Sequence, residues 1–474
     1  MLFVAACADG DSWTTSPSAR LEFSEDTVRF DTVIATHSSP TKTLQVWNRN
    51  KDGVRISNVR LRQGDASHFR VNVDGEFLSG GQGTDFEVRG EDSLFVRLEV
   101  KLPEGRVDSV VHYEDELLFT LESGTQQTVK LTASGQDVYT LRACIIDSDT
   151  TLRAGRPYLI YDSLVVRKGA TLNLEPGVCL MFHDSVSMHV HGRLLAEGTA
   201  ERPIVFRGDR LDRLFPYLPY DNTDHRWGGI RFYGESLGNK MVQCDVHSGD
   251  YGIQCDSAFV LDVERPTLIF DYSVVHNVHG RGLSSVCCYV SAIGSQFSNS
   301  YDTTLHLLGG AYDFVHCTIA QYYPWEYNDA MALFLANCVG DGDDDYRPLA
   351  WAHFINCVIT GRGEDVIEAK IMENQDYRCD YRFQNCFLRT EVSQDNARFV
   401  NVVYDADTLA VTGEKHFLNY VDEGYNFSFL PDSLSPIRGM ADVEIARKLS
   451  PFDRRGTDRL ASGQPDAGAY QSKY

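Results

Sequence analysis

The first part of the chain, from residue 20 to about residue 138, alternates apolar and polar residues in short runs. Because successive side chains of a β-strand point to opposite sides, this alternation predicts strands with one buried face. Turn residues such as Asp74, Gly75 and Gly80 separate the runs. The clearest runs cover residues 27–30, 44–47, 69–73, 94–98 and 117–121. Short strands at regular spacing predict an antiparallel β-sandwich.

The rhythm changes from about residue 140. Apolar runs such as 164–166, 178–182 and 203–206 are separated by turn residues that include Gly169 and Gly192. No helical segment is indicated between these runs. Short strands that follow one another in this way predict the first coils of a parallel β-helix.

A weak repeat follows further along the chain. Residues 314–319, 354–359 and 383–388 each begin with Phe and have Cys in the fourth position. Looser copies centre on Cys244, Ser273, Ser295 and Cys338. From 273 to 357 the central positions lie 22, 22, 21 and 19 residues apart, and the two flanking steps are each 29. A period of about 20 residues is typical of one coil of a β-solenoid, and the longer steps predict coils with inserted loops.

The repeat predicts where its cysteines lie. Strand alternation places Cys317 and Ile319 on one face, and stacked coils align equivalent residues in columns inside the solenoid. Phe314 lies three positions before the cysteine, so a bend must separate them if both side chains point inward. The residue just before the cysteine, such as Asn356, suits that bend. Because cysteine is small and readily buried, we expect these cysteines in the core rather than at a catalytic or metal site.

The twelve cysteines are distributed in a way that argues against two common roles. None lies between residues 8 and 143, and no two have CxxC spacing. The sequence therefore predicts neither a disulfide framework nor a structural zinc site. Cys287 and Cys288 are adjacent, so on a strand their side chains point to opposite faces.

The first residues of the chain resemble a bacterial lipobox. Val4-Ala5-Ala6-Cys7 places small residues before a cysteine that such a motif lipidates after cleavage. We expect a lipid anchor at Cys7, with residues 1–19 as signal-peptide remnant, lipobox and Ser/Thr-rich tether. The expected location is the outer membrane or cell surface. A periplasm-facing position, or a chance apolar start to a cytosolic protein, are the alternatives.

Three short blocks near the end of the chain carry the most specific motif. They are residues 435–439 (Ser-Pro-Ile-Arg-Gly), 453–459 (Asp-Arg-Arg-Gly-Thr-Asp-Arg) and 465–471 (Pro-Asp-Ala-Gly-Ala-Tyr-Gln). They resemble the closing pattern SPxxxxG, DxxGxxR and PDxGAYE of a bacterial right-handed parallel β-helix repeat family of lipoproteins. Gln471 stands where Glu is usual, and the first block is compressed.

That resemblance implies a right-handed parallel β-helix over residues 139–474 and a location outside the cytoplasm, but no particular reaction. Part of the tail is expected to cap the solenoid and shield its last open edge. Residues 20–138 are similar in architecture to the immunoglobulin-like domains that precede other modules in surface lipoproteins. The expected fold is therefore all-β, with a sandwich followed by a solenoid.

Charge narrows the range of partners. The formal net charge of -23 opposes binding to nucleic acid and to anionic lipid surfaces, so the membrane is expected as a partner only through the lipid anchor. A glycan or an envelope protein remains as a partner. No apolar run of about 18 residues occurs, so no transmembrane helix is expected.

No cofactor is expected, with calcium as a weak alternative. Asp341, Asp343 and Asp345 alternate in a loop as calcium ligands do, but the remaining ligands of an EF-hand are missing. A solvated acidic turn explains the same residues. His189 and His191 share one strand face, yet no third metal ligand can be named for them.

Candidate catalytic and binding residues are few. Glu368 and Lys370 lie two apart on one strand face and are the candidates for acid–base chemistry, although a solvated ion pair explains the same spacing. Aromatic residues in two loops offer flat faces to a sugar or a protein; these are Tyr322, Tyr323, Trp325, Tyr327, Tyr217 and Tyr220. The competing interpretation is that these loops fold back and bury their rings.

The patterns together favour a non-catalytic cell-envelope lipoprotein that presents β-helix loops for glycan or protein binding. The alternative is a polysaccharide lyase or glycoside hydrolase that acts on an extracellular polysaccharide. Only the catalytic β-helices of other families support that alternative, by analogy of fold. A structural role in envelope assembly is a third interpretation.

Overall fold

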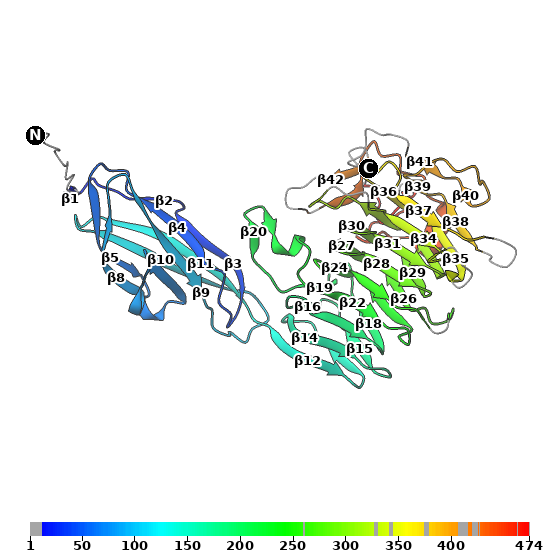
Figure 1. Ribbon diagram of the computed structural model, residues 1–474, viewed down its shortest axis with the longest axis horizontal. Helices are drawn as coiled ribbons and strands as arrows, with labels where there is room; N and C mark the ends of the chain where they lie inside the picture. The colour runs from blue at the N-terminus through cyan, green and yellow to red at the C-terminus, as the bar shows by residue number, and fades with distance from the viewer. Residues whose placement is uncertain are drawn as a thin grey trace, which may run out of the picture. The chain divides into compact units, whose positions relative to one another are not determined.

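The computed structural model divides the chain into two compact units, Met1–Val138 and Tyr139–Tyr474 (Figure 1). The structure describes residues 12–258, 261–326, 330–340, 345–373, 379–405, 416–419, 425, 427–461 and 463–473. Four residues singled out in the sequence lie outside these ranges: Cys7, Tyr327, Asp341 and Asp343. No helix in the described ranges has both the length and the apolar character needed to span a membrane.

The first unit is a β-sandwich of two mainly antiparallel sheets. One sheet contains β1 (Trp13–Thr14), β5 (Gly53–Leu61), β8 (Gln82–Val88), β10 (Val111–Leu121), β11 (Gln126–Gln136) and β3 (Thr27–Ile34). The other contains β2 (Glu22–Phe23), β4 (Lys42–Trp47), β9 (Ser93–Val100), β6 (Phe69–Val73) and β7 (Glu76–Phe77). Two 3-10 turns, η1 (Gly64–Ala66) and η2 (Ser79–Gly81), connect strands. All five apolar runs predicted as strands lie within these sheets, so the sandwich prediction is confirmed.

The second unit is a parallel β-helix whose strands form three faces, A, B and C, in chain order around each coil. Face A contains the first parts of β12 (Tyr139–Ile146) and β14 (Tyr158–Val166), then β16 (Cys179–Phe182), β19 (Ile204–Gly208), β24 (Cys244–His247), β27 (Val274–Val278), β30 (Gln296–Ser300), β33 (Thr318–Gln321), β36 (Val358–Gly361), β39 (Phe387–Leu388) and β41 (Val403–Tyr404).

Face B continues β12 and β14 through β17 (Ser187–Val190), β22 (Gly229–Phe232), β25 (Ile253–Cys255), β28 (Leu283–Val286), β31 (Leu305–Leu308), β34 (Leu333–Ala336) and β37 (Ile367–Lys370). Face C contains β13 (Thr150–Leu152), β15 (Thr171–Leu174), β18 (Arg193–Glu197), β23 (Asn239–Val242), β26 (Leu268–Asp271), β29 (Tyr289–Ile293), β32 (Gly310–Val315), β35 (Leu349–Ile355), β38 (Tyr381–Gln384) and β40 (Phe399–Val400).

From β23 onward, the corner between faces C and A is made by one residue with left-handed backbone geometry. His316, Asn356 and Asn385 occupy this position in successive coils, with φ of 51°, 55° and 52°. Asn tolerates this region better than most residues, because its short polar side chain bonds locally. The bend predicted just before each repeat cysteine is therefore present.

The residue after each corner points inward and forms a column of small side chains along the core. Its members are Cys244, Ser273, Ser295, Cys317, Cys357 and Cys386, all with 0% exposure. Each thiol or hydroxyl donates a hydrogen bond to a backbone carbonyl of the preceding coil, as in Cys317 Sγ to Ala292 O at 3.4 Å and Ser295 Oγ to Phe270 O at 2.8 Å. The prediction that the repeat cysteines belong to the core is confirmed. All eleven described cysteines are free thiols.

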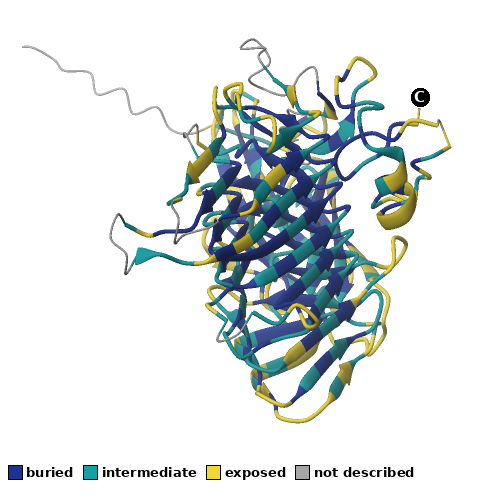
Figure 2. Ribbon diagram, turned by 90° about the vertical axis from the view of Figure 1, so that its right-hand side faces the viewer, coloured by how far each residue is buried: buried dark blue, intermediate teal, exposed yellow. Residues whose placement is uncertain are grey.

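A column of phenylalanines lies beside the small residues, on the inner side of face C. The Phe314, Phe354, Phe383 and Phe399 rings stack with centroids 5.2, 4.9 and 5.1 Å apart. Figure 2 shows the resulting pattern, in which buried stretches run along the strands and exposed residues gather in loops.

The two adjacent cysteines differ in burial, as predicted. The side chain of Cys288 is buried and that of Cys287 is partly exposed.

One member of the predicted repeat is wrong. Thr318 pairs with Val358, so Cys317 and Cys357 belong to neighbouring coils and no coil lies between them. Cys338 follows β34 and lies at the corner between faces B and C. The apparent steps of 21 and 19 residues are therefore two parts of one long coil that carries inserted loops.

The described contacts of the closing motif run along the outer side of face A. Gly468 N donates to Asn356 O at 2.8 Å, Ala469 N donates to Thr318 Oγ1 at 2.9 Å, and Gln243 Nε2 donates to Arg454 O at 3.0 Å. The tail also contains the hairpin of β42 (Phe417–Asn419) and β43 (Ser428–Pro431) and the helix α1 (Val443–Leu449). The apolar outer positions of face A are buried beneath it.

Two aspartates of the motif hold the tail in shape. Asp453 accepts hydrogen bonds from the backbone N–H groups of Arg455, Thr457 and Gln471. Asp466 does the same for Gly439 and Ser472. Because buried N–H groups without partners are costly, these two carboxylates stabilise the conformation of the tail.

The small-residue column leads to a stability prediction. Cys317→Asp should lower the free energy of unfolding by at least about 3 kcal/mol, because it buries a charge without a partner. Cys317→Ser should cost far less, since Ser273 and Ser295 occupy the same position in other coils. Thermal melting of the three proteins checks this. Equal melting temperatures for the Asp and Ser variants would contradict the column.

Candidate functional site

The outer side of face A carries a column of polar residues that stacking aligns. His247 pairs with His276, and His276 pairs with Ser298, in three successive coils. Their neighbours Val246, Val275 and Phe297 point into the core with 0% exposure, so the alternation of each strand turns the polar side chains outward. The two imidazole rings stack with their centroids 4.9 Å apart.

A network of ionisable groups surrounds the two histidines. Asp245 Oδ1 lies 2.9 Å from His247 Nδ1 and 3.2 Å from His276 Nε2. His247 Nε2 lies 2.8 Å from Asp221 Oδ1, and Arg207 Nε lies 2.9 Å from the same oxygen. Both ring nitrogens of His247 therefore face carboxylates.

Electrostatics favours the charged forms of Asp245 and His247 in the protein alone. Burial opposes a charge on Asp245, but the charges and hydrogen bonds of His247 and His276 hold the pKa of its carboxyl well below the usual range. Burial likewise opposes a charge on His247, yet Asp221 and Asp245 raise the pKa of its imidazole to about 10. The arrangement stabilises positive charge between two carboxylates, which a proton or a cation can supply.

The insertion between β19 and β22 supplies Asp221. This segment contains β20 (Arg213–Phe215), β21 (Leu218–Pro219) and the 3-10 turn η3 (Tyr220–Asn222). Thr223 N and Oγ1 both donate to Tyr220 O and close the turn. Asp221 is thereby brought over face A, where its carboxylate reaches His247.

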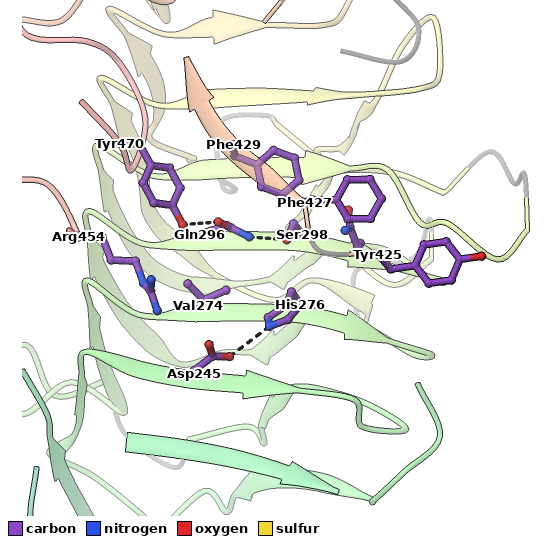
Figure 3. A pocket seen from close by; sticks show the side chains of 11 residues that line it. Asp245, Val274, His276, Gln296, Ser298, Tyr425, Phe427, Phe429, Arg454 and Tyr470 are labelled. Atoms are coloured by element: carbon purple, nitrogen blue, oxygen red, sulfur yellow. Dashed lines mark hydrogen bonds and ion pairs between the residues drawn. The ribbon is translucent and has the colours of Figure 1, made fainter. Parts of the chain in front are cut away.

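A pocket of about 190 Å³ lies next to Asp245 and His276 (Figure 3). We call it the face A pocket. Its lining residues are Asp245, Val274, His276, Gln296, Ser298, Asn299, Tyr425, Phe427, Phe429, Arg454 and Tyr470. Face A provides a mostly polar floor, while the returning tail provides the aromatic residues and Arg454.

The closing motif builds one wall of this pocket. Tyr470 donates its hydroxyl proton to Gln296 Oε1, and Gln296 Nε2 donates to Ser298 Oγ at 2.8 Å. Arg454, from the second block of the motif, points toward Val274 and Asp245 (Figure 3). The motif therefore contributes side chains to the pocket as well as holding the tail in place.

Two polar atoms of the lining residues, Asn299 Oδ1 and Arg454 Nε, are buried without a hydrogen-bond partner among the described residues. Asn299 is 1% exposed and donates from Nδ2 to Asn277 Oδ1 at 3.3 Å, but its Oδ1 accepts no hydrogen bond there. An unsatisfied buried acceptor is costly, and a donor entering the pocket would remove that cost.

A second group of ionisable residues lies at the edge of the insertion. His279 Nδ1 lies 3.2 Å from Asp224 Oδ2, which also accepts a hydrogen bond from the Tyr323 hydroxyl. His225 Nδ1 lies 2.6 Å from Asp250 Oδ1. The histidines of this group thus have different carboxylate partners.

Several of the predicted aromatic residues pack against residues that line the face A pocket and do not line it themselves. Tyr322 and Tyr323 are 0% and 5% exposed, so these two rings follow the interpretation in which the loop folds back and buries them, and they are not exposed binding surfaces. Tyr322 stacks on Phe429, and Trp325 packs against Tyr425 with ring centroids 4.3 Å apart. Both partners line the face A pocket.

The two aromatics of the insertion differ from each other. Tyr217 is 52% exposed, whereas Tyr220 is partly buried beneath the guanidinium of Arg210, which lies 4.0 Å from its ring centroid. The loops therefore fold back only in part.

The remaining predicted site residues lie elsewhere. Glu368 is exposed on β37, and Lys370, on the same outward side of that strand, donates to Val339 O at 3.4 Å. Face B carries this strand, so neither residue joins the face A pocket. Asp345 is partly buried near Gly340. His191 stacks on Tyr233 and pairs with Glu235 at 2.9 Å.

Sequence reasoning missed Asp245 and His247, although a signal for them exists. Aligning Cys244 with Ser273 in the repeat places His247 and His276 at the same position of successive coils, three residues after the small inward residue. Asp221, Arg454 and Tyr470 reach the site from the insertion and the tail, and the repeat carries no signal for them.

Comparisons with known proteins add no functional assignment. No family model matches this chain, and no curated protein matches it. The catalytic domain of a GH87 alpha-1,3-glucanase in complex with nigerose aligns over 74% of this chain and 82% of its own, with 10% identity and a TM-score of 0.19. The ASH/PapD-like domain of human CEP192 aligns over 26% of this chain and 89% of its own, with 18% identity and a TM-score of 0.18.

A family 123 glycoside hydrolase from Clostridium perfringens aligns over 24% of this chain and 25% of its own, with 9% identity and a TM-score of 0.18. The match thus spans about a quarter of that hydrolase. At these TM-scores none of the three likenesses supports an argument, so the site is interpreted from its own geometry.

Proposed function

We propose that this protein is a cell-envelope lipoprotein that binds a glycan in the face A pocket without cleaving it. The observation that carries the proposal is the pocket itself, in which aromatic rings stand opposite a polar floor with an unsatisfied acceptor on Asn299. The apolar face of a sugar ring can pack on aromatic rings, while its hydroxyl groups bond polar side chains. A pocket with aromatic rings opposite a polar floor therefore fits a sugar.

The size and charge of the pocket narrow the ligand. A volume of about 190 Å³ is below the ~300–1,000 Å³ of pockets for drug-sized ligands, and it suits a single sugar ring of a longer chain. Asp245 and Arg454 carry opposite charges on the lining. Their charges balance, so a neutral sugar is favoured over an acidic one.

The set of carboxylates supports binding rather than hydrolysis. Glycoside hydrolases commonly place two carboxylates on either side of the scissile bond. Among the described lining residues, Asp245 is the only carboxylate, and it is engaged with two histidines. In this proposal the sandwich unit serves as a spacer between the membrane and the solenoid.

Glycan binding is tested by retention of the protein on immobilised neutral and acidic polysaccharides. We expect retention on a neutral glycan, and Phe427→Ala should weaken binding at least about tenfold because it removes an aromatic wall. Phe95→Ala is the matched control, since Phe95 is 49% exposed on β9 of the sandwich. If Phe427→Ala and Phe95→Ala lost glycan binding equally, the face A pocket would be rejected as the binding site.

The same incubation distinguishes binding from catalysis. The polysaccharides are assayed for new reducing ends and for unsaturated products after exposure to the protein. Their absence together with retention supports the proposal. Their appearance would replace it with the alternative of a polysaccharide lyase or glycoside hydrolase.

The proposed anchor is tested separately at Cys7. The protein is expressed with a complete secretion signal, and membranes are separated from soluble fractions. Cys7→Ala should move the protein into the soluble fraction, because a protein without acyl chains loses the apolar contact that holds it to the bilayer. Cys144→Ala, at a partly exposed thiol of the solenoid, should leave the fractionation unchanged. Membrane association that survives Cys7→Ala would contradict a lipid anchor.

A further inference from the structure

Three potential metal ligands converge beside the face A pocket. The carboxylate oxygen Asp245 Oδ1 lies 2.9 Å from His247 Nδ1 and 3.2 Å from His276 Nε2, and the three donor atoms lie within 4.8 Å of one another. The packing of the solenoid does not require two imidazoles to converge on one carboxylate, because the same outer column continues with Ser298 and Ala320 in the next two coils.

We propose that Asp245, His247 and His276 bind a single divalent transition-metal ion, for which Zn²⁺ is the best-suited candidate. No glycan is needed for this site, so the inference goes beyond the proposed function and stands independently of it.

The donor set selects the class of ion. Two imidazole nitrogens and one carboxylate oxygen suit Zn²⁺ and its first-row neighbours, whereas Ca²⁺ and Mg²⁺ prefer oxygen ligands alone. Zinc bonds to His and Asp are about 2.0–2.2 Å long, which places tetrahedral donor atoms roughly 3.3 Å apart. The two distances from Asp245 Oδ1 need only small adjustments to reach that value.

The surroundings of His247 match those of a metal-binding histidine. When an ion binds, it displaces the Nδ1 proton and takes the lone pair of that nitrogen, while Nε2–H keeps donating to Asp221 Oδ1, which lies 2.8 Å away. Metal-ligating histidines commonly donate their second N–H to a carboxylate, which fixes the tautomer and the orientation of the ring. The carboxylate of Asp221 is held by Arg207, whose Nε lies 2.9 Å from Asp221 Oδ1.

The ligands lie on rigid strands, and the site stays open on one side. β24 supplies Asp245 and His247 and β27 supplies His276, and these strands pair in register. His247 is nearly buried, but Asp245 and His276 keep 29% and 22% of their side-chain surface exposed and line the face A pocket. Three protein ligands with an open fourth position are typical of zinc that binds water or a ligand.

The second group of ionisable residues is a weaker candidate. Asp224 already accepts the Tyr323 hydroxyl, and His225 pairs with Asp250 rather than with Asp224. His225 also keeps 50% of its side-chain surface exposed. The two histidines of this group therefore do not share one carboxylate oxygen, as His247 and His276 share Asp245 Oδ1.

The test is a titration of the untagged, metal-stripped full chain with Zn²⁺ alone, in which isothermal calorimetry records the heat of binding. We expect one tight site per chain, lost in Asp245→Asn and in His276→Gln. Asp221→Asn should weaken binding by about 10–100-fold through loss of the positioning hydrogen bond. His183→Gln is the matched control, because His183 pairs with Asp209 at 2.6 Å but belongs to neither group. It should bind Zn²⁺ as the unaltered chain does.

Two measurements on the unaltered chain do not depend on whether the variants fold. Co²⁺ should give a spectrum of nitrogen and oxygen ligands, and anomalous scattering from a Zn²⁺-soaked crystal should place the ion between the three side chains. A thiolate charge-transfer band, an anomalous peak elsewhere, or no Zn²⁺ binding would overturn the proposal. Because no glycan is present, these results are independent of whether the protein binds a sugar.

Discussion

The stacking register at the corner between faces C and A is the constraint on which the second unit depends. In six successive coils, a residue with left-handed geometry stands at this corner and a small donor follows it, as Asn356 and Cys357 do. The donor side chain then bonds a carbonyl of the preceding coil, while backbone ladders align on both sides. A slip by one residue would turn every inward side chain outward, so this corner fixes the register of those coils.

The same register creates the site. When inward residues are aligned, outward residues are aligned too, so His247 and His276 stack without any dedicated loop. Where the outer columns become apolar, at Ala320 and Val358, the returning tail covers them. Where they remain polar, the tail leaves a pocket. The division of face A into a covered part and an open part thus follows from the outward residues of a few coils.

Sequence patterns predicted those parts of the molecule that local alternation determines. The sandwich strands, the buried cysteines and the stacked phenylalanines all follow from periodicity of two within strands and from repetition between coils. Cys338 was misassigned because inserted loops lengthened one coil to about twice the apparent period, and spacing alone cannot separate a long coil from two short ones. The site was not predicted because Tyr470 and Gln296 are 174 residues apart and meet only through the fold of the tail.

The end of the tail connects the interior contacts of the tail with the face A pocket. Gln471 Oε1 accepts a hydrogen bond from Asp466 N at 2.9 Å, which helps to hold this segment in shape. The residue next to it, Tyr470, reaches Gln296 on the pocket floor. The hydrogen bonds that fix the tail therefore also position a side chain that lines the pocket.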